Sequence, residues 1–347
     1  MNVKPFSRVL VFALLVSGAL GACATPPAPT VAPAASPVVA VEAKGKITLY
    51  TSVPQPIADK IQSDFQTRFP GVTLDIFRSG TSEVVAKIMT EKTGGEIIAD
   101  LVWVAEPSTY EDFKAQDLLL KYTPTEAATL SDEMKDKDGY YYAGRLINMV
   151  IAYNTATDPK PKSWKDLLNP AYKGKLAFPS PLNSGAAEGA VKTLADHPNF
   201  GWKYFDDLKA NGAKQASNNS TLRDQIASGE FKVGVLLDYM VREVKPKGAA
   251  IDFVWPDEGA VFIPSPIAIL KTTKNPAAAK AFLDFVLSKQ GQETMVKLGF
   301  FIPVRADVTP PEGAPSLDKI KRLATDWKAV TRDRQATKDK WTELFGK

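Results

Sequence analysis

The sequence predicts an α/β fold with two lobes, each built on a mixed sheet, and a hinge between them. Its 347 residues, 44% of them apolar, are enough for about two domains with ordinary cores. Strand and helix patterns alternate through the first part of the body, which is typical of a parallel sheet covered by helices. A second alternating set follows, and later strands lead back to the first. The chain is therefore expected to cross between the lobes twice.

The N-terminal segment indicates a lipoprotein signal peptide over residues 1–22. Lys4 and Arg8 precede an apolar run that is short for a membrane span and has the length of a signal-peptide core. The run ends in LGAC, which resembles a bacterial lipobox, so Cys23 is expected to carry a lipid anchor outside the cytoplasmic membrane. Residues 23–44 are rich in Pro and Ala and predict an extended tether. An ordinary secretory signal and a lone membrane anchor helix are the alternatives.

The first lobe is predicted from spacings that change from strand to helix and back. Ile57, Ile61 and Phe65 recur every four positions, which indicates a helix. Ser79 to Ser82 provide N-cap residues in front of a second helix. Ligands of such sheets bind at the carboxyl ends of the strands. The expected elements are strands at 47–51, 72–77 and 99–104 and helices at 56–69 and 83–90.

The second lobe is predicted to have its own sheet. The tail from Ser316 onward is a charged amphipathic helical stretch, expected to pack on a lobe surface. The expected elements of this lobe are strands at 147–153, 175–178 and 232–237 and helices at 186–196 and 221–229. Strands at 251–254 and 261–270 are then expected to return to the first lobe, followed by a helix at 276–289. The expected boundaries are 45–146 and 262–315 for lobe 1, and 147–261 and 316–347 for lobe 2.

Charge and rare residues restrict the function. Forty-three basic residues against 39 acidic ones leave only +4, which indicates no nucleic-acid partner. One Cys and one His exclude disulfide frameworks and Cys/His metal clusters. The patterns GxxxxGKS/T, GxGxxG and HExxH do not occur, so nucleotide binding and zinc hydrolysis lack their usual parts. A catalytic triad would need His197 as its base, and a surface or capping role is the ordinary interpretation of such a residue.

Small hydroxyl, amide and glycine residues recur at the predicted turns from strand to helix. Free backbone N–H groups and hydroxyls at helix N-termini suit an anion, although N-capping alone also explains these residue types. Arg145 lies just before the second lobe and could bind an anion bidentately, or form a structural ion pair. Tyr239 follows a strand and could be a phenolate ligand, a hydrogen-bond donor or a packing residue. The turns contain Ser52, Ser79-Gly80-Thr81-Ser82, Ser184-Gly185 and Asn219.

Seven stretches of the body resemble a known family. They are ITLYTSVP (47–54), RSGTSEVVAKI (78–88), ADLVWVAEP (99–107), IAYNT (151–155), SPLNSGAAEGA (180–190), WPDEGA (255–260) and KNPAAAKAFLDFVLSKQGQE (274–293). These residues look like the bacterial extracellular solute-binding proteins of ABC importers, in the group of ferric-ion, thiamine, sugar-phosphate and 2-aminoethylphosphonate binders. The resemblance covers nearly the whole body. It implies the two-lobed type II periplasmic-binding-protein fold, no catalysis and no cofactor, a monomer, and a membrane permease as partner.

The resemblance also implies which residues bind the ligand. In the ferric-ion binders an anion lies at a Ser-Gly-Ala helix start near an Asn, a pattern matched here by Ser184, Gly185, Ala186 and Asn219. The metal half of that pattern is degraded, because there is no Tyr pair at 238–240 and Glu106 is displaced by about one position. The expected ligand is thus a small solute with a phosphate, phosphonate or carboxylate group. The candidate ligand-binding residues are Ser52, Ser79, Gly80, Thr81, Ser82, Glu106, Arg145, Ser184, Gly185, Ala186, Asn219 and Tyr239.

Ferric iron remains the alternative ligand. Hard Fe³⁺ favours anionic oxygen, and Tyr153 and Tyr239 could supply phenolates beside a synergistic anion. Two classes other than a binding protein are also open. An exported hydrolase would need a metal cluster or a base beside a nucleophile, and a cell-wall adhesin would leave the anion-suited turns unexplained.

Overall fold

The computed structural model describes residues 43–346. The predicted signal peptide, Cys23 and nearly all of the predicted tether lie outside these residues. Ala43, which the sequence assigned to the tether, is buried in the core beside the first strand. Within the described part, the helices are all too short or too polar to cross a bilayer.

Lobe 1, the part built on β1, β2 and β3, has the predicted alternation of strands and helices. β1 pairs in parallel with β2 on one side and with β3 on the other. Helix α1 buries Ile57, Ile61 and Phe65, the residues whose spacing predicted it. Helix α3 was not predicted, although Tyr110 and Phe113 lie three positions apart and are fully buried. The bounds are β1 Gly45–Thr51, α1 Gln55–Arg68, β2 Val72–Arg78, α2 Thr81–Thr93, β3 Leu101–Trp103 and α3 Pro107–Ala115.

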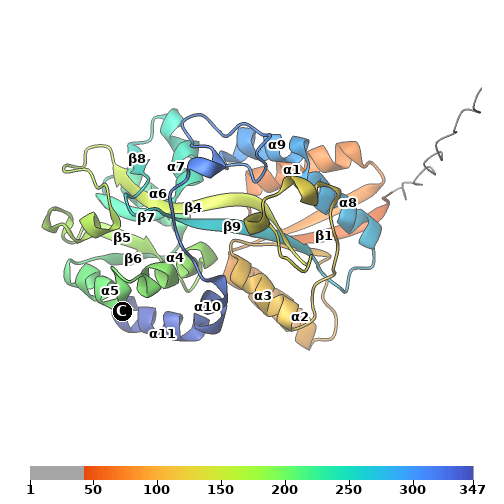
Figure 1. The fold of residues 1–347 in the computed structure, drawn as a ribbon, viewed down its shortest axis with the longest axis horizontal. Coiled ribbons are helices and arrows are strands. Elements are labelled where there is room, and N and C mark those ends of the chain that lie inside the picture. The colour runs from red at the N-terminus through yellow and green to blue at the C-terminus, as the bar shows by residue number, and fades with distance from the viewer. Residues whose placement is uncertain (1–42, 347) are drawn as a thin grey trace, which may run out of the picture. The chain divides into compact units, whose positions relative to one another are not determined.

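Two long antiparallel strands, β4 (Tyr142–Asn154) and β9 (Ala260–Ile269), connect the two ends of the molecule (Figure 1). The first part of β4 pairs with β9 and the last part with β7 and β8. The two predicted sheets are thus joined into one ten-stranded mixed sheet within the described residues. β4 is buried along almost its whole length, and neighbouring strands pair with its backbone throughout. The predicted lobe boundaries at 146 and 261 fall inside these strands and stay a prediction.

Lobe 2, the part built on β5, β6 and β7, has its own parallel ladder, in which β5 lies between β6 and β7. β5 and β7 are buried, and α4, α6 and α7 each follow a strand, as the sequence predicted for α4 and α6. Helix α5 was not predicted. The bounds are β5 Leu176–Pro179, α4 Gly185–Asp196, α5 Gly201–Ala210, β6 Lys214–Ala216, α6 Asn219–Ala227, β7 Val233–Leu237, α7 Asp238–Val244 and β8 Ile251–Val254.

The chain then returns to lobe 1, where α8 (Pro276–Leu287) matches the helix expected at 276–289 and α9 (Lys289–Gly299) was not predicted. Ser288 separates the two helices because its hydroxyl oxygen accepts a hydrogen bond from the N–H of Gly291 at 3.1 Å and so caps α9. Short 3₁₀ helices lie at Thr125–Thr129, Asp132–Met134, Trp164–Leu168, Pro170–Tyr172, Lys245–Lys247 and Leu317–Lys319.

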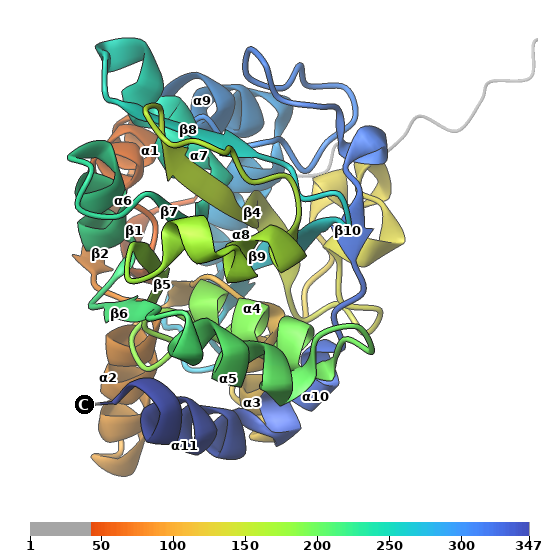
Figure 2. The ribbon, with the colours of Figure 1, turned by 90° about the vertical axis from the view of Figure 1, so that its left-hand side faces the viewer.

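The C-terminal tail is part of the packed body. After β10 (Arg322–Leu323), α10 (Trp327–Arg332) contacts both α3 of lobe 1 and α4 of lobe 2. Helix α11 (Arg334–Phe345) packs on α4 and α5, as Figures 1 and 2 show. Its Trp341 is fully buried against the rings of Phe178 and Phe205. The tail is therefore a third connection between the lobes, which the sequence did not predict.

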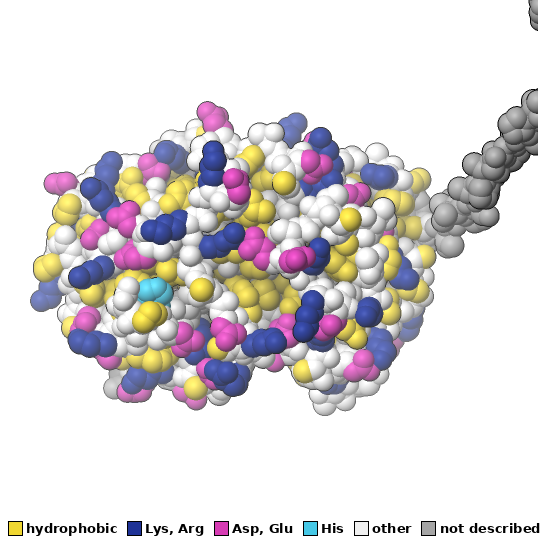
Figure 3. Space-filling model, in the orientation of Figure 1, with side chains coloured by type: hydrophobic (Ala, Val, Ile, Leu, Met, Phe, Trp, Pro, Cys, Tyr) yellow, Lys and Arg dark blue, Asp and Glu magenta, His cyan; other side chains and the backbone are white. Residues whose placement is uncertain are grey.

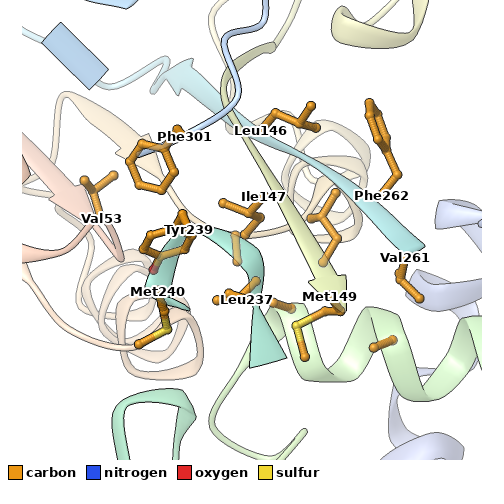
Figure 4. Packing of buried hydrophobic residues seen from close by; sticks show 14 of the residues in the cluster. Val53, Leu146, Ile147, Met149, Leu237, Tyr239, Met240, Val261, Phe262 and Phe301 are labelled. Atoms are coloured by element: carbon orange, nitrogen blue, oxygen red, sulfur yellow. The ribbon is translucent and has the colours of Figure 1, made fainter. Parts of the chain in front are cut away.

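The core follows the central strands. Figure 4 shows Ile147 and Met149 of β4 beside Leu237 at the end of β7, with Tyr239 and Phe301 packed next to them. On the surface, basic and acidic side chains are interspersed over the face drawn in Figure 3, in keeping with the small net charge. His197 is half-buried at the end of α4, where its ring lies on Phe200 and its Nδ1 accepts a hydrogen bond from the N–H of Asn199 at 3.2 Å.

Candidate ligand-binding site

A cavity of about 600 Å³, which we call the cleft, lies between the two lobes at the carboxyl ends of the strands. Residues from β1, β2, β4 and β7 and from the starts of α2, α4, α6 and α7 line it. This is the position at which an open α/β sheet binds its ligands. The cleft brings together eight of the twelve predicted residues: Ser52, Gly80, Thr81, Arg145, Ser184, Ala186, Asn219 and Tyr239.

The N-termini of α2, α4 and α6, three helices of nine residues or more, point toward the cleft. Ser184 caps α4 and its hydroxyl oxygen accepts the N–H of Ala187 at 3.2 Å, while Asn218 caps α6. Asn219 donates from Nδ2 to the Ser184 hydroxyl oxygen at 2.9 Å, which joins the two helix starts. Ser184 therefore does cap its helix. The same arrangement also directs the positive ends of the helix dipoles toward the cleft.

Arg145 is the most informative residue of the cleft. Its side chain is 2% exposed, and its Nε donates to the Ser265 hydroxyl at 3.0 Å. The guanidinium lies 5.2 Å from the ring centroid of Phe301, and its Nη1 has no hydrogen-bond partner. Within residues 43–346 no carboxylate forms an ion pair with it, and burial lowers its pKa. The structural ion pair that the sequence left open is thus not formed.

Tyr239 lies in the first turn of α7, beside Arg145 of β4. Its ring lies 4.5 Å from that of Phe301, and only 6% of the residue is exposed. Burial raises the pKa of Tyr239, although the charge of Arg145 opposes the shift. The phenol is therefore protonated at neutral pH and can donate a hydrogen bond to an anion.

Four charged residues of the cleft were not predicted. Arg78 ends β2, is exposed, and donates only to the Val53 carbonyl oxygen at 3.4 Å. Arg223 is paired with Asp224 at 2.9 Å and lies 3.6 Å from Glu243, so part of its charge is neutralised. The signal for Arg78 was its place directly after a predicted strand. The lining charges are Arg78, Arg145 and Arg223 against Glu83 and Glu243.

Four predicted residues do not line the cleft. Ser79 is held by its backbone, whose N–H donates to the Thr51 carbonyl oxygen at 3.1 Å. Ser82 donates to the Leu182 carbonyl oxygen at 2.9 Å and so joins the lobes instead of contacting a ligand. The remaining two, Glu106 and Gly185, face each other in the seam between the lobes.

The structure separates the two tyrosines of the iron alternative. Tyr153 pairs with Val233 at the start of β7, whereas Tyr239 follows the end of that strand at Leu237. Four residues of extended chain, roughly 13 Å, separate the two positions along β7, and the Tyr153 hydroxyl is paired with Asp252. Tyr153 does not line the cleft, and the part of the chain that the structure describes has no group of three His, Cys, Asp or Glu suited to a metal.

A mixed sheet with two lobes and a ligand-sized cleft between them defines the two-lobed solute-binding proteins. The model of the bacterial extracellular solute-binding protein family matches residues 96–332, and the chain belongs to this family. The sequence resemblance and the predicted fold are thereby confirmed.

Relatives of known name show what similar chains bind. A putative 2-aminoethylphosphonate-binding periplasmic protein of Salmonella typhi is 25% identical over 82% of this chain and 87% of its own length. The major ferric iron-binding protein of Neisseria meningitidis is 23% identical over 88% of this chain and 95% of its own length. The structure of the periplasmic binding protein AfuA of Actinobacillus pleuropneumoniae, with fructose-6-phosphate bound, superimposes with a TM-score of 0.79 at 25% identity, covering 88% of this chain and 99% of that one.

Proposed function

We propose that this protein is the lipid-anchored binding component of an ABC importer, which captures a small organic anion in the cleft and delivers it to the permease. The favoured ligands are phosphonates and phosphate esters. The observation that carries the proposal is Arg145, a buried guanidinium at the cleft without a carboxylate partner. Its counter-charge is then supplied by the ligand.

Burial energetics support this assignment. A buried charge without a partner costs several kcal/mol, and a hydroxyl such as that of Ser265 offsets only part of this cost. An anionic group restores the missing pair, and a guanidinium binds phosphate or carboxylate oxygens bidentately. The N-termini of α2, α4 and α6 and the protonated Tyr239 add donors around the same volume. The cleft is therefore suited to oxygen anions.

Binding requires no catalysis. Ligand contacts from both lobes favour the closed arrangement by a population shift, and the permease distinguishes closed from open. Ser82 already bridges to Leu182 across the seam, which is the type of contact that closure forms. The anchor is proposed from the lipobox-like residues before Cys23, with an ordinary secretory signal as the alternative. We propose in addition that the body is extracytoplasmic, either in the periplasm or on the outer face of the cell, and that it acts as a monomer.

A ligand panel tests the proposal. Thermal unfolding is followed with 2-aminoethylphosphonate, fructose 6-phosphate and ferric citrate, and the visible spectrum is recorded with the last. We expect a phosphonate or phosphate ester to raise the midpoint, since a ligand at about 100 times its Kd adds about 2.7 kcal/mol. Ferric citrate should give no tyrosinate charge-transfer band. A coloured protein that the two organic anions do not stabilise would establish the iron alternative in its place.

A further inference from the structure

The seam between the lobes holds a carboxyl group that the cleft does not use. Glu106 precedes α3 of lobe 1 and is 2% exposed. Its Oε1 accepts a hydrogen bond from the Thr109 hydroxyl at 2.7 Å, and its Oε2 has no partner. Oε2 instead lies against the α-carbon side of Gly185, the first residue of α4 in lobe 2, where a Cβ would overlap with it. The glycine of the predicted anion turn is thus occupied by the protein's own carboxyl group.

The charges around Glu106 are not balanced if it is ionised. From α4, Glu188 faces it, and from α11, Arg334 and Lys338. From its own helix, Tyr110 is close enough to sense its charge, and Asp112 shares Arg334.

Arg334 and Lys338 are both committed to Glu188, at 2.8 and 3.2 Å. Arg334 also forms an ion pair with Asp112. Two cations therefore serve two other carboxylates, and no cation is left for Glu106. Burial, followed by the charge of Glu188, raises the pKa of Glu106 to about 8. In the arrangement that the structure shows, the carboxyl group is thus neutral at pH 7.

We propose that closing the lobes takes up one proton from solvent at Glu106, so that Glu106 acts as a positioning residue that couples ligand capture to pH. The proposal rests on the proposed function for its ligand. When the seam opens, Glu106 leaves Gly185 and Glu188 and meets water, where a glutamate ionises near pH 4.3. Closure then requires the proton to return, and the neutral carboxyl fits against Gly185.

The sign of the effect follows from linkage. The closed form binds the proton more tightly than the open form, so closure is favoured as pH falls. The advantage is complete below about pH 4.3 and is lost as pH rises through about 8. Between these limits the apparent ligand affinity should fall about tenfold for each unit of pH. If Glu106 had a purely structural role, it would make no contribution to the pH dependence of ligand affinity over this range.

The test compares the parent with Glu106→Gln, which imitates the neutral carboxyl. Calorimetric titration with 2-aminoethylphosphonate at about pH 6 and pH 8, in buffers of different ionisation enthalpy, gives affinity and protons taken up. Titration of the phosphonate itself is common to both proteins and cancels in the comparison. Relative to the variant, the parent should lose roughly one to two decades of affinity over this interval and take up close to one proton more near pH 6.5. Equal pH profiles in the two proteins would overturn the proposal.

Three further measurements keep the outcomes distinct. Glu293→Gln on the exposed surface of α9 is the control for charge removal and should follow the parent. Should Glu106→Gln fold poorly, Glu188→Gln serves instead, because removing the facing charge should move the midpoint of the pH profile of affinity to lower pH.

If neither 2-aminoethylphosphonate nor fructose 6-phosphate binds, the proposed function fails. Small-angle scattering of the ligand-free proteins then decides for Glu106: the parent should become more compact relative to Glu106→Gln as pH falls from about 8 to about 6, and a difference that stays constant would overturn the proposal.

Discussion

Two buried arginines lie next to the first turn of α7, Arg242 beside Asp238 and Arg145 beside Tyr239, and they are held in opposite ways. Arg242 is 7% exposed and forms an ion pair with Asp238, which is fully buried. It also donates from Nε to the Phe300 carbonyl oxygen at 3.1 Å. Arg145 is 2% exposed and its side-chain partners are two hydroxyl groups, those of Ser265 and Tyr239. Each guanidinium lies on a phenylalanine ring, and each keeps an unpaired Nη1, so the difference is the carboxylate.

This difference indicates a structural role for Arg242 and a ligand-binding role for Arg145. Asp238 additionally accepts hydrogen bonds from the backbone and the side-chain amide of Asn148, at 3.0 and 3.1 Å, so the pair around Arg242 is complete within the protein. A complete buried pair stabilises the fold only modestly but is costly to break. Arg145 is incomplete in the protein alone, which is the usual condition of a residue kept for a ligand at some expense of stability.

The largest effect is expected where the complete pair is broken. Arg242→Met leaves Asp238 buried without a counter-charge, so the free energy of unfolding should fall by about 3–5 kcal/mol. Urea titration of the ligand-free protein measures the loss. Arg68→Met, on the exposed face of α1, is the matched control and should change little. A loss below about 1 kcal/mol would mean that Asp238 is neutral or solvated and that the comparison is mistaken.

The second effect should appear in binding and not in folding. Arg145→Met removes a charge-assisted donor, so affinity for 2-aminoethylphosphonate should fall by about 1.5–3 kcal/mol, roughly 10- to 150-fold. The ligand-free protein should be as stable as the parent or more so, because an unpaired buried charge is replaced by an apolar side chain. Calorimetric titration and urea unfolding of the same preparation give both numbers. Destabilisation as large as that of Arg242→Met would show a structural role for Arg145.

The sequence was sufficient to predict that Arg145 lies at the cleft, but not to predict which side chains surround it. An arginine at the start of a long apolar strand that crosses between lobes is unusual enough to be noticed, and its place at the cleft follows from the predicted topology. That no carboxylate meets it depends on residues such as Ser265, 120 positions away. Long-range contacts of this kind leave no periodic signal in a sequence.

Three predicted site residues, Tyr153, Glu106 and Gly185, lie outside the cleft lining for two different physical reasons. Tyr153 shares the strand parity of Arg145, but eight residues of β4 separate them, roughly 26 Å, so strand length alone removes Tyr153 from the cleft. Glu106 and Gly185 were assigned to the ligand because each type suits an anion site. They meet each other across the seam, and only the packing of the two lobes shows it. Most strands and helices with clear periods were predicted well. Helices α3 and α5 were missed, although the residues that they bury recur at helical spacing: Tyr110 and Phe113 in α3, and Tyr204, Phe205 and Leu208 in α5.

The smallest effect concerns the neutral donor beside Arg145. Tyr239→Phe keeps the ring that packs on Phe301 and removes only the hydroxyl, so affinity should fall by about 0.5–1.5 kcal/mol, roughly two- to tenfold. Because burial raises the pKa of Tyr239, the hydroxyl keeps its proton through neutral pH. The ratio of parent to variant affinities should therefore stay constant from about pH 6 to pH 9, measured by calorimetric titration with 2-aminoethylphosphonate. A ratio that changes with pH would instead indicate a phenolate at Tyr239, and with it a cleft in which the tyrosine, and not Arg145, determines what is bound.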